Sequence, residues 1–173
     1  TCQALDKVIK DVVPGTMEYE TRAQLQYELL KQGVSRLAFP PICGSGENSC
    51  VLHYKGGAKK MKAGELLVID AGGEFQQYVS DITRTIPVNG KFTPEQAQLY
   101  DIVLEAYQAA LDKCRPGKRF WEPHKAASRI IGNALTEMDI IEHPGLVTTY
   151  FTHSTAHYVG LDVHDKGNYE ILR

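Results

Sequence analysis

The stretch Glu65-Leu66-Leu67-Val68-Ile69-Asp70-Ala71 is a compact apolar run that carries an aspartate near its end. A second stretch rich in β-branched residues follows at 78–88, and Gln76-Gln77 marks a turn between the two. If this turn has an even number of residues, positions an odd number apart face the same side of the hairpin. Asp70 and Asp81 are eleven positions apart. We therefore expect their carboxylates to be direct or diagonal neighbours, within roughly 4.5 to 8 Å.

Two carboxylates this close have two interpretations. Without a cation between them they repel each other, and the pKa of one of them rises. A shared metal site would relieve this repulsion. The alternative is that Asp81 caps a turn while Asp70 bonds backbone amides at the strand end, and these two residues taken alone favour that structural alternative.

Helical patterns precede the predicted hairpin. Residues 3–13 place apolar side chains at helical spacing and end at Pro14-Gly15, and a second helix is expected from about Glu18 to Lys31. The next residues, 36–90, are expected to be mostly sheet.

The same helical plan recurs after the hairpin. Thr93-Pro94-Glu95-Gln96 is typical of a helix start, this helix should stop before Pro116-Gly117, and another helix is expected over about 122–138. The order helix, Pro-Gly, helix thus occurs twice, which indicates a duplicated architecture. No change of composition marks a boundary, so we expect one domain over residues 1–173.

Composition excludes several classes of function. The 173 residues hold 19 Lys and Arg against 21 Asp and Glu, so no global field favours nucleic acid or an acidic membrane. No apolar run approaches the roughly 18 residues of a membrane span. The four cysteines form neither a C-x-x-C pair nor a dense framework, which indicates reduced thiols in a cytoplasmic protein. The chain begins with Thr and stops without a polar tail, so we expect a fragment.

Histidines gather near the end of the chain. Residues 152–165 contain His153, His157 and His164, three of the six histidines. His153 and His157 are four apart and would share a face on a helix or a strand. A neutral imidazole is a common ligand of transition metals, so we expect at least one of them to bind metal. A histidine-rich loop without a role is the alternative.

The other three histidines carry less information. His53 lies in an apolar setting, where a lone histidine is more often a core residue, whereas His124 and His143 adjoin prolines and are expected on the surface. Two carboxylates and an imidazole suit Mn²⁺, with Co²⁺, Fe²⁺ or Zn²⁺ as other options. Hydrolytic sites of this type hold two ions, for which three ligands are too few.

Five stretches together form a more specific pattern: Gly44-Ser45-Gly46-Glu47-Asn48-Ser49-Cys50, Leu52-His53-Tyr54, Val68-Ile69-Asp70-Ala71-Gly72, Ser80-Asp81-Ile82-Thr83-Arg84-Thr85, and the segment from His153 to Asp165. In order and spacing they resemble the catalytic domain of aminopeptidase P and prolidase, the pita-bread metallopeptidases that act on Xaa-Pro bonds. The resemblance covers nearly the whole chain. It implies an α+β pita-bread fold that is incomplete at the C-terminus and lacks the N-terminal domain of most members.

The resemblance also implies a metal site. Asp70 would bind one metal ion, Asp81 would bridge two, and His157 would be the imidazole ligand. Two divalent ions are implied, with Mn²⁺ expected and Co²⁺ or Zn²⁺ able to replace it. Thr83 would orient the ligands.

Further histidines are implied to contact the substrate. His153 and His164 would line the substrate pocket as catalytic residues, one near the proline residue and the other donating to the scissile carbonyl or the tetrahedral intermediate. His53 would lie on the opposite wall, and Asp165 would orient the His164 ring.

The chain departs from the family pattern in its glutamates. Members supply two further metal ligands from glutamates, one of them in a V-x-E-P-G strand where it also acts as the general base. Neither motif is present, and Glu170 does not occupy either position. We therefore expect the 173-residue chain alone to be inactive.

For the complete protein, the resemblance implies metal-dependent hydrolysis of the peptide bond before proline, as an Xaa-Pro aminopeptidase or dipeptidase. Its partner would be a peptide with proline at the second position, and a homo-oligomer is one option. The alternative from another class is a non-catalytic pita-bread module that binds peptides or proteins. Methionine aminopeptidase and creatinase are enzymatic alternatives, but residues 80–92 resemble prolidase and aminopeptidase P more closely.

Overall fold

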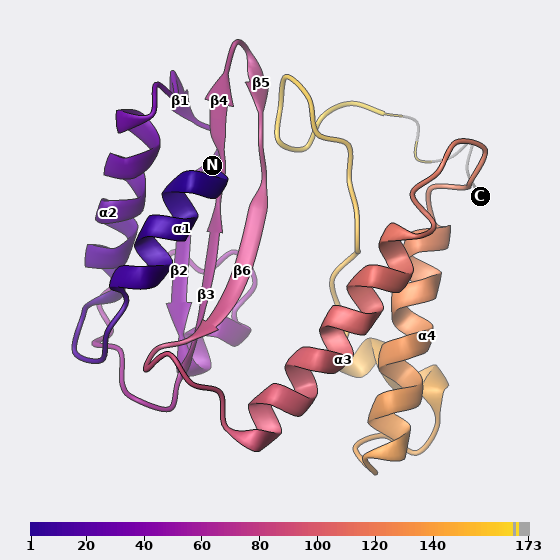
Figure 1. Ribbon diagram of the computed structural model, residues 1–173. Helices are drawn as coiled ribbons and strands as arrows, with labels where there is room; N and C mark the ends of the chain where they lie inside the picture. Colours follow the sequence, from indigo (N-terminus) through magenta and orange to yellow (C-terminus); the bar gives the residue numbers. More distant parts are fainter. Residues whose placement is uncertain (168, 170–173) are drawn as a thin grey trace. The chain divides into compact units, whose positions relative to one another are not determined.

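A long antiparallel hairpin organises the first part of the chain in the computed structural model, which describes residues 1–167 and 169 (Figure 1). β3 (Leu66–Ala71) pairs with β6 (Ile82–Pro87), and β4 (Gly73–Phe75) pairs with β5 (Tyr78–Val79) in the same register. The hairpin turns through Gln76-Gln77, where φ is 51° and 72°. Positive φ at both central residues is typical of a two-residue type I′ turn. The predicted even-length turn is confirmed.

Two short strands complete the sheets. β2 (Ile42–Ser45) pairs with β3 to give the order β2-β3-β6, and β1 (Arg36–Leu37) pairs with β4 to give the order β1-β4-β5. The prediction that residues 36–90 are mostly sheet is wrong for residues 46–65. They form the 3-10 helix η1 (Gly46–Cys50) and turns, because glycines at positive φ interrupt extended pairing there.

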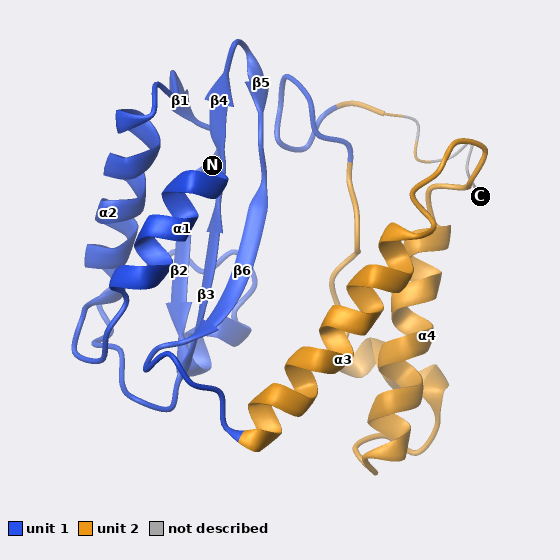
Figure 2. Cartoon of the chain, viewed as in Figure 1, with its two compact units in different colours: residues 1–93, 158–165 blue, residues 94–157, 166–173 orange. Residues whose placement is uncertain are grey.

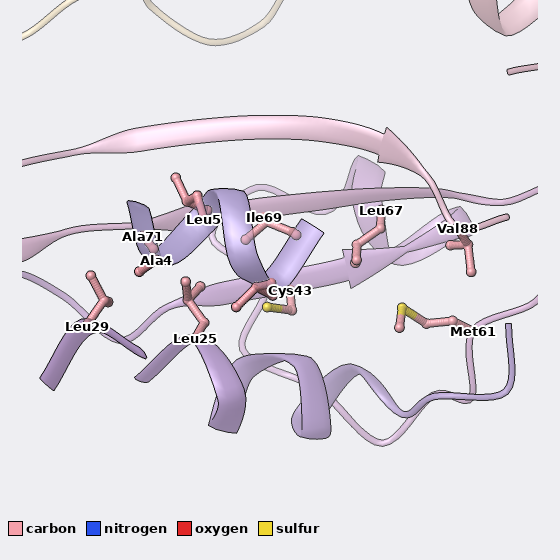
Figure 3. Packing of buried hydrophobic residues seen from close by; sticks show 11 residues of the cluster. Ala4, Leu5, Leu25, Leu29, Cys43, Met61, Leu67, Ile69, Ala71 and Val88 are labelled. Atoms are coloured by element: carbon pink, nitrogen blue, oxygen red, sulfur yellow. The ribbon is translucent and has the colours of Figure 1, made fainter. Parts of the chain in front are cut away.

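Two helices cover one face of the β2-β3-β6 sheet. α1 (Cys2–Asp11) and α2 (Glu18–Lys31) confirm the predicted helix pair. Alternate residues of β3 point toward these helices and are fully buried, whereas Asp70 and its alternate neighbours lie on the other face. Figure 3 shows the resulting core, which contains Ala4, Leu5, Val8, Leu25, Leu29, Cys43, Met61, Leu67, Ile69, Ala71 and Val88.

The helices after the hairpin pack on each other through small residues. α3 (Pro94–Leu111) and α4 (Glu122–Glu137) confirm the second predicted pair, and η2 (Pro144–Thr149) follows. Ala106, Ala110 and Ala127 are buried between them, with partly buried apolar side chains around this cluster. Alanines allow two helices to approach closely.

The chain divides into two compact units (Figure 2). Unit 1 contains Thr1–Thr93 and Tyr158–Asp165, and unit 2 contains Pro94–His157 and Lys166–Arg173. The expectation that all 173 residues act as one catalytic domain stays a prediction. Among the residues that the structure describes, no helix has both the length and the apolar character needed to cross a membrane.

Candidate active site

Asp70 and Asp81 lie close together on the face of the sheet that the helices leave open. The register places Asp70 opposite Thr83, and Asp81 comes two positions before Thr83. The two aspartates are therefore diagonal neighbours on one face. The Asp70 carboxyl accepts a hydrogen bond from the Thr83 hydroxyl, and the nearby Asp81 raises the pKa of this carboxyl. The predicted proximity of the two carboxylates is confirmed, and Thr83 contacts Asp70 as expected.

The backbone beside this pair has no room for a side chain. Gly72 is buried, and a Cβ atom there would lie 1.8 Å from the Ser80 carbonyl oxygen. Only glycine lets the two arms of the hairpin approach this closely just before Asp81. Gly72 therefore determines where the Asp81 carboxylate lies.

The surroundings of Asp70 oppose its charge. Burial, and after it the neighbouring Asp81, raises the pKa of the Asp70 carboxyl to about 6, although the Thr83 hydroxyl and His53 act in the opposite direction. Asp70 Oδ1 is buried and has no hydrogen-bond partner among the described residues. A divalent cation would both satisfy this oxygen and remove the repulsion. The pair thus fits the predicted metal.

His53 belongs to the same part of unit 1. Its charge acts on the Asp70 carboxyl, and its side chain is exposed. The interpretation of His53 as a core residue is therefore wrong, because it lies in an exposed turn. Its φ of 53° lies in the left-handed region, which few residues other than glycine adopt.

His164 lies in a loop that is hydrogen-bonded to the hairpin. The Val79 N–H donates to the Gly160 carbonyl at 2.9 Å, and the Leu161 N–H donates to Asp165 Oδ2 at 3.0 Å. The first bond places residues 158–165 next to β5 in unit 1, although the chain before them belongs to unit 2, and the second bond lies within the loop. His164 is exposed in this loop.

His153 and His157 lie in unit 2, in a segment without regular secondary structure. The prediction that they share a face of a helix or strand is wrong, because no backbone ladder orders residues 151–157. The segment is anchored by His124 instead. A hydrogen bond of 2.6 Å joins His124 Nδ1 to Thr155 Oγ1, and the His124 ring stacks on Phe151 with centroids 5.3 Å apart.

This anchoring corrects the expectation for His124, which is half-buried and bonded rather than a simple surface residue. The tertiary contact that decides its role comes from residues some thirty positions away, so no local pattern indicates it. His143 is exposed, as expected.

The structure thus places Asp70, Asp81, His53 and the His164 loop in unit 1, and His153 and His157 in unit 2. Within residues 1–167 and 169, no group of three or more His, Cys, Asp or Glu side chains is arranged to hold a metal ion. The ligand set that includes His157 stays a prediction. Glu170 lies outside the described residues.

One further buried acid, Glu18, was not expected from the sequence. It is completely buried at the first residue of α2 and accepts hydrogen bonds from residues of the 45–54 segment. The polar run Ser45-Gly46-Glu47-Asn48-Ser49 between apolar neighbours is a signal that some buried partner is required.

Comparison with known proteins decides the family. Residues 1–172 match metallopeptidase family M24. The chain belongs to this family. It is 38% identical to the Xaa-Pro aminopeptidase of Escherichia coli K12 over 98% of its own length and 40% of that protein. It is 36% identical to human Xaa-Pro dipeptidase over 96% of its own length and 36% of that protein.

A solved structure agrees with this assignment. The M24 chain superposes on Pseudomonas aeruginosa aminopeptidase PepP with a TM-score of 0.92 and 39% identity, over 97% of its own length and 40% of that chain. The α+β pita-bread fold predicted from the sequence is confirmed for this part. The chain spans about 40% of the length of the relatives it matches.

Proposed function

We propose that this M24 protein hydrolyses the peptide bond that precedes proline, in peptides with proline at the second position. The observation that carries this proposal is the carboxylate pair on the open face of the sheet, where Asp70 Oδ1 is buried without a partner among the described residues. A binding module has no physical need for two crowded carboxylates. The names of its relatives, Xaa-Pro aminopeptidase and Xaa-Pro dipeptidase, support the choice of bond.

We assign the metal ligands to Asp70, Asp81 and His157. Together with the two glutamate ligands that the resemblance implies, these oxygen and nitrogen donors would hold two divalent ions, with Mn²⁺ as the expected ion and Co²⁺ or Zn²⁺ as replacements. When bound, the ions would polarise the scissile carbonyl and lower the pKa of a water molecule. Thr83 donates to Asp70 and so holds the carboxylate in one orientation.

The histidines handle the substrate in this proposal. His164 and His153 line the pocket as catalytic residues, and His164 donates a hydrogen bond to the carbonyl oxygen as negative charge develops on it. The Leu161–Asp165 bond shapes the loop that presents His164. His53 lies on the wall of the pocket near Asp70, where its charge already acts on that carboxyl.

Residues 1–173 alone are proposed to be inactive, because Asp70, Asp81 and His157 are three of the five ligands that the resemblance implies. We also propose a cytoplasmic location, which is supported by the free state of the four cysteines. A homo-oligomer is compatible with the proposal but is not required by it.

The test uses the natural-length protein with Mn²⁺, an Xaa-Pro peptide and a matched peptide with alanine in place of proline. We expect cleavage of the proline peptide only. Asp70→Asn and Asp81→Asn should each lower kcat/KM by at least about a hundredfold, since ligand loss exceeds the effect of losing a supporting contact. Asp6→Asn, at an exposed aspartate of α1, is the control. Tight peptide binding without hydrolysis would instead indicate the non-catalytic module.

A further inference from the structure

Glu18 is a fully buried carboxylate surrounded by hydrogen-bond donors. Its Oε1 accepts from the Ser45 N–H at 2.7 Å, from the Ser45 hydroxyl at 2.9 Å and from Asn48 Nδ2 at 3.0 Å. Its Oε2 accepts from the Tyr54 hydroxyl at 3.0 Å. A carboxylate that receives this many bonds can remain charged inside a protein, because the donors replace its hydration shell.

The start of α2 does not require this carboxylate. Glu20 already closes the capping box, since its Oε2 accepts from the Met17 N–H at 2.8 Å. All the bonds to Glu18 described above come instead from residues 45–54, which begin at the last residue of β2 and lead through η1 to His53. Burying a charge costs free energy, and the hydrogen bonds that offset this cost also hold their donors in one arrangement. The arrangement determined here is that of the 45–54 segment.

The bonds hold this segment at three points. Ser45 begins it, Asn48 lies in its middle and Tyr54 ends it, and Asn48 also donates to the Tyr54 hydroxyl at 2.9 Å. Lys59 donates to the Ser45 carbonyl at 2.9 Å and adds a fourth attachment. The segment is therefore fixed on both sides of its 3-10 helix.

His53 immediately precedes Tyr54 and has the unfavourable backbone conformation in this segment, with φ at 53°. Such a conformation persists only where neighbouring contacts determine it. The Tyr54 hydroxyl provides that contact one residue away. Burial and the Glu18 carboxylate raise the pKa of the Tyr54 phenol, so the phenol stays protonated and keeps donating.

We infer that Glu18 is a positioning residue, which acts through Tyr54 to hold His53 beside the Asp70–Asp81 pair. This inference rests on the proposed function, because it gives a role to His53 at that site. Glu18 itself lies on the helix-covered side and does not reach the open face.

The first test follows the 173-residue chain by NMR. Tyr54→Phe removes one oxygen atom and with it the link between Glu18 and the residue after His53. We expect amide exchange over residues 46–54 to accelerate about tenfold or more, as for loss of a hydrogen bond to a charged group, and the His53 imidazole signals to shift. Glu18→Gln should have the same effect. Glu28→Gln is the matched control, because Glu28 lies in the same helix and pairs with Lys7 at 2.8 Å. It should change neither the amide exchange over residues 46–54 nor the His53 signals.

The second test uses the natural-length protein and separates this inference from the proposed function. Tyr54→Phe should lower kcat/KM toward an Xaa-Pro peptide about tenfold without changing Mn²⁺ affinity, because Tyr54 is not a proposed ligand. Unchanged His53 signals and unchanged exchange in Tyr54→Phe would overturn the inference, as would equal effects in Glu28→Gln. If the wild type does not hydrolyse the peptide, the proposed function fails instead, and the NMR result still decides whether Glu18 positions His53.

Discussion

At the scale of single residues, Asp70 combines burial, a like charge and an unpartnered oxygen. The three features have one origin, the placement of an acid in an otherwise apolar strand beside a second acid. In the absence of a cation this placement costs stability. The metal-free chain should therefore reveal the cost directly.

Asp70→Asn should stabilise the metal-free chain at pH 8. The pKa of Asp70 rises from 3.8 to about 6 on folding, so its contribution to stability is complete below pH 3.8 and is lost as the pH rises through 6. The variant has no such loss. After allowance for solvent screening, we expect a gain of about 1 kcal/mol at pH 8 and a smaller difference at pH 4.

Urea unfolding at pH 4, 6 and 8 in the presence of a chelator measures this difference. Asp6→Asn should show no comparable pH dependence. A variant that is less stable than the wild type at pH 8 would contradict the argument. Added Mn²⁺ should stabilise the wild type more than Asp70→Asn.

The cysteines differ in their expected reactivity. Burial raises the pKa of the Cys43 thiol to about 12, so the folded chain contains almost no Cys43 thiolate at pH 8. Cys2, Cys50 and Cys114 are exposed. Iodoacetamide should modify these three and spare Cys43, which peptide mass spectrometry can measure. Modification of all four in urea is the control, and rapid labelling of Cys43 in the folded chain would contradict the packing of the core.

At the scale of elements, the hairpin and the helix pairs could be predicted from the sequence, whereas the segments between them could not. The alternation of side chains along each strand and the even number of residues in the turn were enough to predict that Asp81 lies beside Asp70. Pro and Gly residues likewise marked the helix ends. The bonds of Glu18 and His124 join positions 27 to 36 residues apart, and only the folded chain brings such partners together. Similarly, residues 46–65 form turns where a strand was expected, because glycines at positive φ interrupt extended pairing there.

The segment 151–157 depends on α4 for its order. His124→Ala removes both the bond to Thr155 and the stacking on Phe151. We expect hydrogen exchange over residues 151–157 to accelerate about fivefold, as for the loss of roughly 1 kcal/mol of hydrogen bonding. His124→Phe keeps a ring on Phe151 and should give a smaller effect. His143→Ala, at an exposed histidine of the same unit, is the control, and equal exchange in all variants would exclude this anchoring.

At the scale of the whole molecule, the two units bury their apolar residues unequally. Unit 1 encloses a continuous core between two helices and a sheet. In unit 2, α3 carries five large apolar side chains that are 42% to 58% exposed: Leu99, Val103, Leu104, Tyr107 and Leu111. A cluster of this kind favours association.

The 173-residue chain should therefore self-associate as its concentration rises. Val103→Lys and Tyr107→Lys together should reduce association, and each should change stability by no more than about 0.5 kcal/mol because both sites are exposed. Light scattering after size-exclusion chromatography measures the mass across a concentration series. Lys91→Ala, at an exposed position outside the cluster, is the control. A wild type that stays monomeric throughout would contradict this prediction.

The unbroken register of the hairpin limits how sequences related to this one can change in length. Extra residues at the tip, Gln76-Gln77, leave the paired arms as they are, and both acids keep facing the same way. A single residue inserted into or deleted from either arm between the tip and an acid would turn that acid toward the helices. Homologues that retain both aspartates should therefore differ in length at the tip of the hairpin, and should conserve whether each arm has an odd or an even number of residues.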